Sequence, residues 1–421
     1  VLGAGQLTLP YAFAELGWAA GLGFLVAFAL LGIYSLHLLS MHSIRWEPQG
    51  PSQSLLAMPQ ETQLRCHSSY TNLAVDKLGP RAKHVCDLML FVYSWGGAVA
   101  FMIILKGELG YLLLRASGMA PGDHALLPDS VLLVIVSVAV VLPLSAMRNP
   151  AALKRFSPLG SAAALFITAV VLASARWEVD TSSFAGILAV CKAGPFADGA
   201  QYRRWPRSFF SAFAALPLLS FALNASWAFV PILAGFGRKT PGRVACLIWS
   251  SSLAIAADYA LLALVGSATF CSAVDPNILA SLGQTCSGGW NCGIVLVAKV
   301  ALVVQLTLAL PLRFFVARSV VCASWPETLR TRWLVAASLV LIAATLAAAP
   351  LQLSVAIGVT SSIGASVIIY ILPALIDISV GKEFIASNIL RRACSILSLV
   401  LGFTLLLAGT VTNLMGAGVG G

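Results

Sequence analysis

The sequence predicts an all-α polytopic membrane protein with about eleven transmembrane helices, and three observations support this fold class. Hydrophobic residues make up 59% of the 421 residues and charged residues only 10%, whereas a soluble domain carries about 25% charged residues. Eleven apolar segments are long enough, or nearly so, to cross a bilayer. The basic residues lie mainly in the gaps between them, so the net charge of +10 indicates membrane topology rather than binding to nucleic acid.

The apolar segments divide the chain into regularly spaced crossings. The first begins at Val1 without a methionine and is shorter than a full crossing, so we expect the chain to lack the N-terminal part of its first helix. We expect a single transmembrane domain over 1–421. The predicted segments cover 1–14, 18–44, 84–113, 130–147, 158–175, 208–236, 244–270, 293–322, 332–349, 351–378 and 392–414.

The distribution of lysine and arginine predicts the orientation. If each segment crosses once, eighteen of these residues, Arg313 and Arg318 among them, fall on the same side as the N-terminus, and six fall on the other side. The positive-inside rule places the richer side in the cytosol. We therefore expect a multi-pass integral membrane protein, surrounded by lipid, with a cytosolic N-terminus.

Four cysteines fall in two loops on the opposite side. Cys191 can form a disulfide bond with one of Cys271, Cys286 and Cys292, or all four are free thiols. The sequence contains no CxxC pair, no paired-histidine spacing, no nucleophile elbow and no phosphate loop. We therefore expect no metal site, no cofactor and no enzymatic activity.

Two segments contain residues that interrupt helices. Two glycines and a proline lie within Gly3–Pro10, and Pro217 and Pro231 bracket polar residues, Asn224 among them, in the sixth segment. Irregular backbone inside a bilayer persists only where it lines a cavity or binds something. The alternative for the sixth segment is a kinked helix whose small polar residues pack against neighbours.

The positions of the two interruptions favour an inverted repeat. They fall in the first and sixth of ten core helices, which predicts a 5+5 arrangement with a first repeat at about 1–175, a second at about 208–378 and an extra helix at about 392–414. Secondary transporters with such repeats bind substrate at the midplane, between discontinuous helices 1 and 6. Two further intramembrane groups, Asp258 and Thr307, are candidates for binding an ion, although threonine often bonds to its own helix.

Several stretches resemble the amino acid/auxin permease family. Gly3-Ala-Gly-Gln-Leu-Thr-Leu-Pro-Tyr-Ala-Phe13 is similar to the opening motif of that family. Later stretches resemble further family landmarks in the same order, at 94–101, 142–157, 220–224, 308–318 and 364–373. The resemblance covers nearly the whole chain. It implies a LeuT-like fold of the amino acid-polyamine-organocation superfamily, with discontinuous helices 1 and 6.

The resemblance also implies a binding site. Asn224 stands where the family often has histidine, and the asparagine of sodium-coupled members would precede Val1, so the coupling ion stays open between Na⁺ and H⁺. The substrate carboxylate is expected at the first interruption, and other groups are expected to face the substrate. The predicted substrate-binding residues are Gly3, Ala4, Gly5, Gln6, Phe101, Ser220, Phe221 and Asn224.

The main hypothesis is an ion-coupled symporter of neutral amino acids that works as a monomer by alternating access. A plasma membrane or a vacuolar or lysosomal membrane would suit such a protein. The alternatives are transport of another small substrate on the same fold, such as a polyamine or an auxin-like acid, and an amino-acid sensor without flux.

Overall fold

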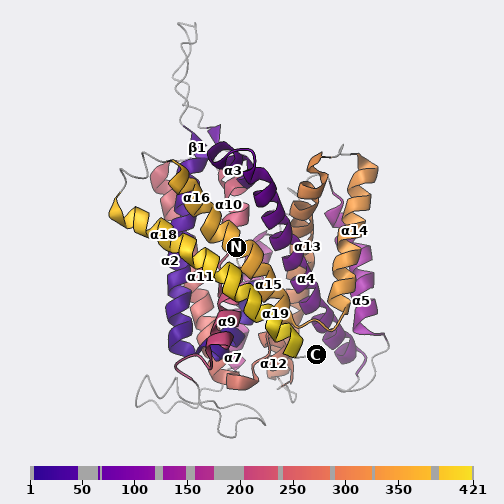
Figure 1. Cartoon of the computed structure of the whole chain (residues 1–421). Helices are drawn as coiled ribbons and strands as arrows, with labels where there is room; N and C mark the ends of the chain where they lie inside the picture. Colours follow the sequence, from indigo (N-terminus) through magenta and orange to yellow (C-terminus); the bar gives the residue numbers. More distant parts are fainter. Residues whose placement is uncertain are drawn as a thin grey trace, which may run out of the picture.

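The computed structural model of the chain describes residues 4–45, 65–66, 69–118, 127–147, 157–174, 203–235, 240–284, 290–324, 328–380 and 388–419. In this part of the chain, helices pack side by side into a bundle (Figure 1). Eight of them are long and apolar enough to cross a membrane, and Asp129–Ser145 and Pro158–Ser174 are shorter apolar helices. The predicted all-α membrane fold is confirmed.

Each predicted crossing corresponds to one helix or to one run of consecutive helical pieces. The runs are interrupted at the first and sixth crossings, and the fourth, tenth and eleventh contain π-helical turns. The elements are η1 (Ala4–Thr8) with α1 (Leu9–Leu16), α2 (Trp18–Ser43), α4 (Ala82–Ala116), α5 (Asp129–Val136) with η2 (Ser137–Val141) and α6 (Leu142–Ser145), α7 (Ser157–Ser174), α9 (Phe209–Ala222) with α10 (Ser226–Ala234), α11 (Pro241–Phe270), α13 (Trp290–Val321), α14 (Leu329–Ala348), α15 (Leu353–Thr360) with η6 (Ser361–Ala365), η7 (Val367–Ile371) and α16 (Leu372–Ser379), and α18 (Ile389–Thr404) with η8 (Leu405–Gly409) and α19 (Thr410–Val419).

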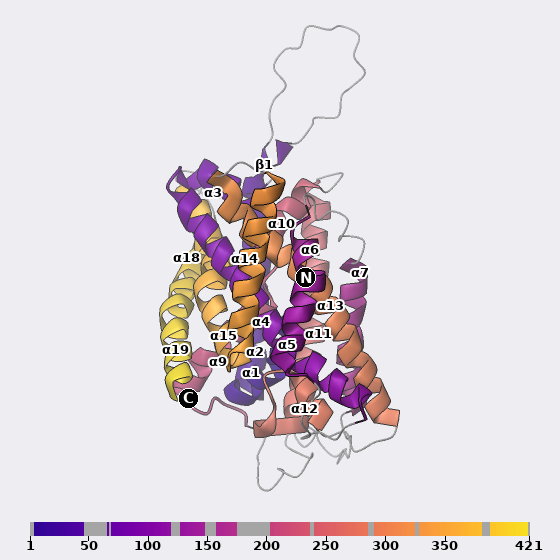
Figure 2. The same cartoon turned by 90° about the vertical axis from the view of Figure 1, so that its right-hand side faces the viewer.

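Short elements at the two ends of the bundle were not predicted. Helix α3 (Tyr70–Leu78) and the two-residue strands β1 (Ile44–Arg45) and β2 (Arg65–Cys66), which pair antiparallel, lie at one end. Helix α12 (Ile278–Gln284) lies at the other end (Figure 2). The turns η4 (Cys271–Ala273) and η5 (Cys322–Ser324) follow α11 and α13. These elements are too short and too polar to be found by searching for membrane crossings.

Helix α3 is anchored to the bundle by its first residue. Tyr70 is buried, and its hydroxyl donates a hydrogen bond of 2.8 Å to the carbonyl oxygen of Ile368 in η7. Burial raises the pKa of Tyr70 well above its usual value, so the hydroxyl stays protonated and can donate. The Ser69 side chain caps the helix by accepting from the Asn72 amide at 3.1 Å.

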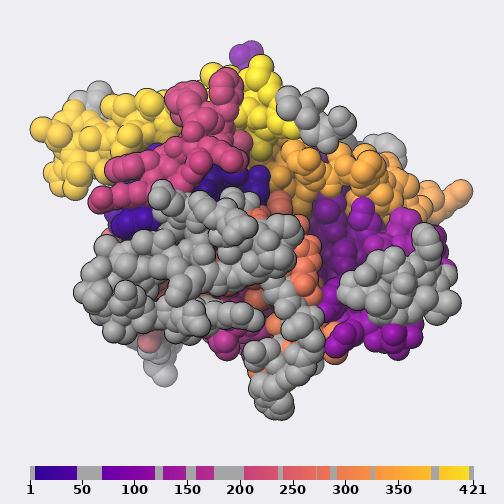
Figure 3. All heavy atoms as spheres, turned by 90° about the horizontal axis from the view of Figure 1, so that it is seen from below, coloured from indigo at the N-terminus to yellow at the C-terminus, as the bar shows by residue number. Residues whose placement is uncertain are grey.

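Helices α4 and α13 pack along each other inside the bundle, and α14 flanks both. The C-terminal run, α18 to α19, crosses the outside of the bundle obliquely (Figure 1). Seen from below, the yellow C-terminal run covers the upper left of the molecule and borders the orange segments on the right (Figure 3). The outer face of α18 exposes apolar side chains such as Leu397, Val400 and Phe403, as a lipid-facing helix requires.

A one-residue turn joins the first two crossings. Gly17, between α1 and α2, has φ +78° and ψ +150°, a conformation that a residue with a Cβ rarely adopts. A Cβ there would also lie 2.6 Å from the Trp205 backbone nitrogen. The adjacent Trp18 amide donates to the Arg203 carbonyl oxygen at 3.0 Å. The segment that precedes α9 is thereby held against the turn.

Candidate functional site

The first crossing changes helix type near its start. Ala4–Thr8 forms the 3-10 turn η1, and α1 follows with Pro10 in its first turn. Proline is tolerated there because the first amides of a helix have no acceptor within the helix. The Thr8 hydroxyl donates to the Gly5 carbonyl oxygen at 2.9 Å. The change of helix type leaves backbone carbonyl groups without their usual helical partners. The Thr8 hydroxyl satisfies one of them locally, inside an apolar span.

The sixth crossing breaks between α9 and α10. Helix α9 ends at Ala222 and α10 begins at Ser226. The Asn224 side-chain oxygen accepts from the Ser226 amide at 3.0 Å and so begins the second helix. Pro217 and Pro231, the predicted borders of the break, lie inside α9 and α10 instead. The predicted discontinuity is confirmed, and an asparagine turn forms it.

The two breaks are in contact. A Cβ at Gly5 would lie 2.9 Å from Ala222 Cα and 3.2 Å from Phe221 Cδ1, so a glycine is needed for the backbone of η1 to approach α9 this closely. Helix α9 packs against both η1 and α1. The first and sixth crossings therefore meet where both are irregular.

A cavity of about 360 Å³ lies at this junction. Its walls come from η1, α2, α4, the α9–α10 break, α11, α13 and η7. Its volume is at the lower end of the range of about 300–1,000 Å³ for small-molecule sites. The cavity runs along α10, which contacts α3, so it extends towards the end of the bundle where α3 lies.

Half of the predicted substrate-binding residues line this cavity: Gly5, Phe101, Phe221 and Asn224. Gln6 is buried, and its side-chain nitrogen donates to the Ala164 carbonyl oxygen of α7 at 3.2 Å, away from the cavity lining. Ser220 is buried and does not line the cavity. Ala4 belongs to η1, and Gly3 lies outside the described residues. The substrate roles of all eight stay predictions.

The two predicted ion-binding residues lie apart from the cavity lining. The Thr307 hydroxyl donates to the Val303 carbonyl oxygen of its own helix at 2.7 Å, the alternative that the sequence left open. Asp258 lies half-buried on α11, beside Thr168 of α7. The ion-binding roles of Thr307 and Asp258 stay predictions.

The predicted disulfide bond is tested only in part. Cys271, at the end of α11, is disulfide-bonded. Cys191 and Cys286 lie outside the described residues. The pairing of Cys191 with one of the other three cysteines therefore stays a prediction.

Sequence reasoning missed Arg313 and Tyr93, two residues that line the cavity. It counts Arg313 and Arg318 among the charges at the cytosolic ends of helices, but both are buried within α13. Arg318 donates to the carbonyl oxygens of Ser145 and Met147 at 2.9 and 3.0 Å, at the end of α6. An arginine nine residues inside the predicted end of a crossing, directly after Pro311 and Leu312, is the signal that could have identified Arg313 as intramembrane.

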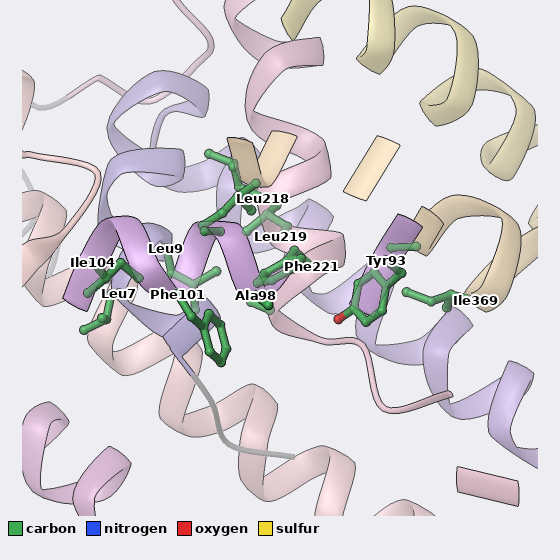
Figure 4. Packing of buried hydrophobic residues seen from close by; sticks show 14 of the residues in the cluster. Leu7, Leu9, Tyr93, Ala98, Phe101, Ile104, Leu218, Leu219, Phe221 and Ile369 are labelled. Carbon is green, nitrogen blue, oxygen red and sulfur yellow. The ribbon is translucent and has the colours of Figure 1, made fainter. Parts of the chain in front are cut away.

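Aromatic rings from two helices surround the Arg313 guanidinium. Its central carbon lies 4.2 Å from the ring centroid of Phe101, 5.3 Å from that of Phe221 and 5.4 Å from that of Tyr93. Figure 4 shows these three rings along α4 and the end of α9. Each such contact stabilises a buried cation by about 0.5–2 kcal/mol.

At the other end of the bundle, a buried ion pair joins α4, α13 and the segment before α12. Lys299 Nζ lies 2.7 Å from Glu108 Oε2, and both side chains are almost fully buried. Asn277 Nδ2 donates to Glu108 Oε1 at 2.6 Å. Lys106, two residues before Glu108 on α4, takes no part in this pair and donates to the carbonyl oxygens of Ala348 and Ala349. The cluster holds α12 over the end of the bundle opposite α3.

Comparison with known proteins agrees with this architecture. Residues 1–415 match the family model described as transmembrane amino acid transporter protein. The zebrafish (Danio rerio) sodium-coupled neutral amino acid symporter 2 is 24% identical, over 96% of this chain and 77% of that protein. Human (Homo sapiens) solute carrier family 38 member 8 is 24% identical, over 79% of this chain and 68% of that protein.

A solved structure shares the fold. The crystal structure of MhsT in complex with L-phenylalanine superposes with a TM-score of 0.54 and 14% identity, over 98% of this chain and 94% of that chain. At this identity the likeness concerns the fold, which agrees with the predicted LeuT-like arrangement of discontinuous helices. Since the family model covers almost the entire chain, this protein belongs to the transmembrane amino acid transporter family.

Proposed function

We propose that the protein is a secondary transporter that moves neutral amino acids by ion-coupled alternating access, with the substrate in the cavity between the two broken helices. The observation that carries the proposal is the cavity itself, which adjoins Gly5 of η1 and the α9–α10 break. Broken helices supply backbone groups to a substrate at mid-membrane. The zebrafish relative is named as a sodium-coupled neutral amino acid symporter.

The orientation belongs to the same proposal. The cavity extends to the end of the bundle that carries α3, where Lys77 lies in the helix and Arg81 and Lys83 follow it. The positive-inside rule favours the cytosol for this end. The N-terminus would then be cytosolic, and the cavity would open inward.

Uptake into proteoliposomes tests the function and the coupling ion together. Radiolabelled L-glutamine and L-alanine are offered under an inward sodium gradient, under a proton gradient, and without a gradient. Accumulation above equilibrium under one gradient supports symport and identifies the ion. Absence of uptake under all three conditions, from protein that is folded by size-exclusion chromatography, contradicts the proposal.

A further inference from the structure

Arg313 is a buried cation whose hydrogen-bonding capacity is incomplete. Its side chain is 9% exposed and lines the cavity. Among the described residues, its Nη1 atom has no hydrogen-bond acceptor. Three aromatic rings surround the guanidinium. Their faces attract a cation, but they do not replace the acceptors that its N–H groups had in water.

The cavity also lacks a negative charge to balance Arg313. In the described part of the chain, the ion pairs of buried carboxylates join Asp377 to His42 and Arg391, and Glu108 to Lys299. None of these groups lines the cavity. A cation or a cationic side chain entering the cavity would therefore be repelled, and an anion would be attracted.

A second unsatisfied donor lies on the same cavity. Asn224 is 6% exposed, and its Nδ2 atom has no hydrogen-bond partner among the described residues. Its Oδ1 atom already accepts from the Ser226 amide, which fixes the orientation of the side-chain amide. The Tyr93 hydroxyl lies within hydrogen-bonding reach of both Asn224 and Arg313. One hydroxyl oxygen can accept from only part of their N–H groups, and Arg313 Nη1 and Asn224 Nδ2 are left without an acceptor among the described residues. The unsatisfied polar atoms of Asn224 and Arg313 are donors, so their missing partner is an acceptor.

We propose that Arg313 and Asn224 bind a carboxylate group of the substrate, and that this group is the anchor for ligands in the cavity. A carboxylate has acceptors only and matches the planar fork of a guanidinium. The proposal rests on the proposed function in taking the cavity as the substrate site. It assigns the carboxylate to α13 and the α9–α10 break, whereas the family resemblance places it at η1. The group is either the α-carboxylate or a side-chain carboxylate.

Three isosteric ligands distinguish these sources. L-Glutamine carries only an α-carboxylate, L-isoglutamine carries only a side-chain carboxylate, and L-glutaminamide carries neither. Their affinities are measured by thermal stabilisation of the purified full chain, for the wild type and for Arg313→Gln and Arg313→Lys. Propionate and propionamide repeat the comparison without an ammonium group. Arg115→Gln, at the exposed end of α4, is the control.

The expected result is a preference of roughly 10- to 150-fold for one carboxylate ligand over L-glutaminamide, the range for hydrogen bonds to charged groups. Arg313→Gln should reduce this ratio to about one. Arg313→Lys should retain part of it, because lysine keeps the charge but loses the fork. The ligand preferred by the wild type identifies the carboxylate.

Two outcomes overturn the proposal. One is an unchanged ratio in Arg313→Gln, including the case in which all three ligands weaken equally, as a purely structural role predicts. The other is a wild type that no carboxylate stabilises. Failure of the proposed function looks different: the Arg313-dependent preference is present, but proteoliposomes accumulate no amino acid.

Discussion

At the scale of single residues, Gly97 lets α4 approach the Arg313 side chain. A Cβ at this position would collide with Arg313 Nη1, the end of a flexible side chain. We expect Gly97→Ala to displace the guanidinium, with little change in the thermal unfolding midpoint and a roughly tenfold loss of affinity for carboxylate ligands. Gly107→Ala, on the same helix with open space around it, should leave the affinity unchanged. Equal affinities in both variants would contradict the role of Gly97.

Asn224 combines a structural hydrogen bond with an unsatisfied donor, and two substitutions separate them. Asn224→Asp keeps an oxygen that accepts from the Ser226 amide but replaces the donor with a charge that competes for Arg313. We expect an unfolding midpoint near that of the wild type and at least a roughly tenfold loss of carboxylate affinity. Asn224→Ala should also lower stability, by about 1 kcal/mol, because the turn loses the side-chain oxygen that accepts from the Ser226 amide. Wild-type affinity in Asn224→Asp would limit this residue to its structural role.

At the scale of elements, the ion pair between α4 and α13 is a stability determinant. Removing one partner of a buried pair leaves an uncompensated charge and costs about 3–5 kcal/mol. We therefore expect Lys299→Met to lower the unfolding free energy by this amount. Adding Glu108→Gln should restore most of the loss, since glutamine still accepts from Asn277. Reversible denaturation in mixed micelles measures both variants.

Lys106→Met is the matched control for the ion pair. Lys106 lies two residues before Glu108 on α4 and points to another side of the helix, where its Nζ reaches only carbonyl oxygens at 3.4 and 3.5 Å. We expect this variant to lose less than about 1 kcal/mol. A loss as large as that of Lys299→Met would show that general packing, rather than the buried charge, determines the effect.

The elements were largely predictable from the sequence because hydropathy depends on composition alone. A stretch of about 20 apolar residues is a crossing whatever it packs against, and the glycines and prolines mark the broken spans. The exact position of the break in the sixth crossing was not predictable. The turn at Asn224 sets this position, whereas the two prolines are accommodated inside the flanking helices. The depth of Arg313, nine residues inside the predicted end of its crossing, marks it as intramembrane. That it faces the cavity was not predictable, because only its packing against α4 and α9 reveals this.

At the scale of the whole molecule, the structure is accessible at one end and covered at the other. The cavity extends towards α3, whereas α12 packs on η1 and α13 at the opposite end. In a transporter that alternates between two conformations, the end from which the cavity is reached must change from one to the other. A ligand shifts the populations of the two conformations only if it binds them with different affinities. The accessibility of cavity residues should therefore depend on the substrate.

A cysteine at Ser252, which lines the cavity from α11, tests this dependence in a background whose other reactive cysteines are replaced by alanine. In membrane vesicles of defined orientation, an impermeant maleimide should modify Ser252→Cys only from the side of α3, because α12 covers the opposite end. Substrate should slow the reaction several-fold, since it occupies the cavity and favours its closure. Lys77→Cys, on α3 outside the membrane-spanning helices and with a native side chain that is 28% exposed, should be modified from the same side without substrate dependence. Modification of Ser252→Cys at equal rates from both sides would contradict a cavity that is reached from one end. It would indicate a pathway open to both sides at once, and such a pathway could not couple the movement of one solute to that of another.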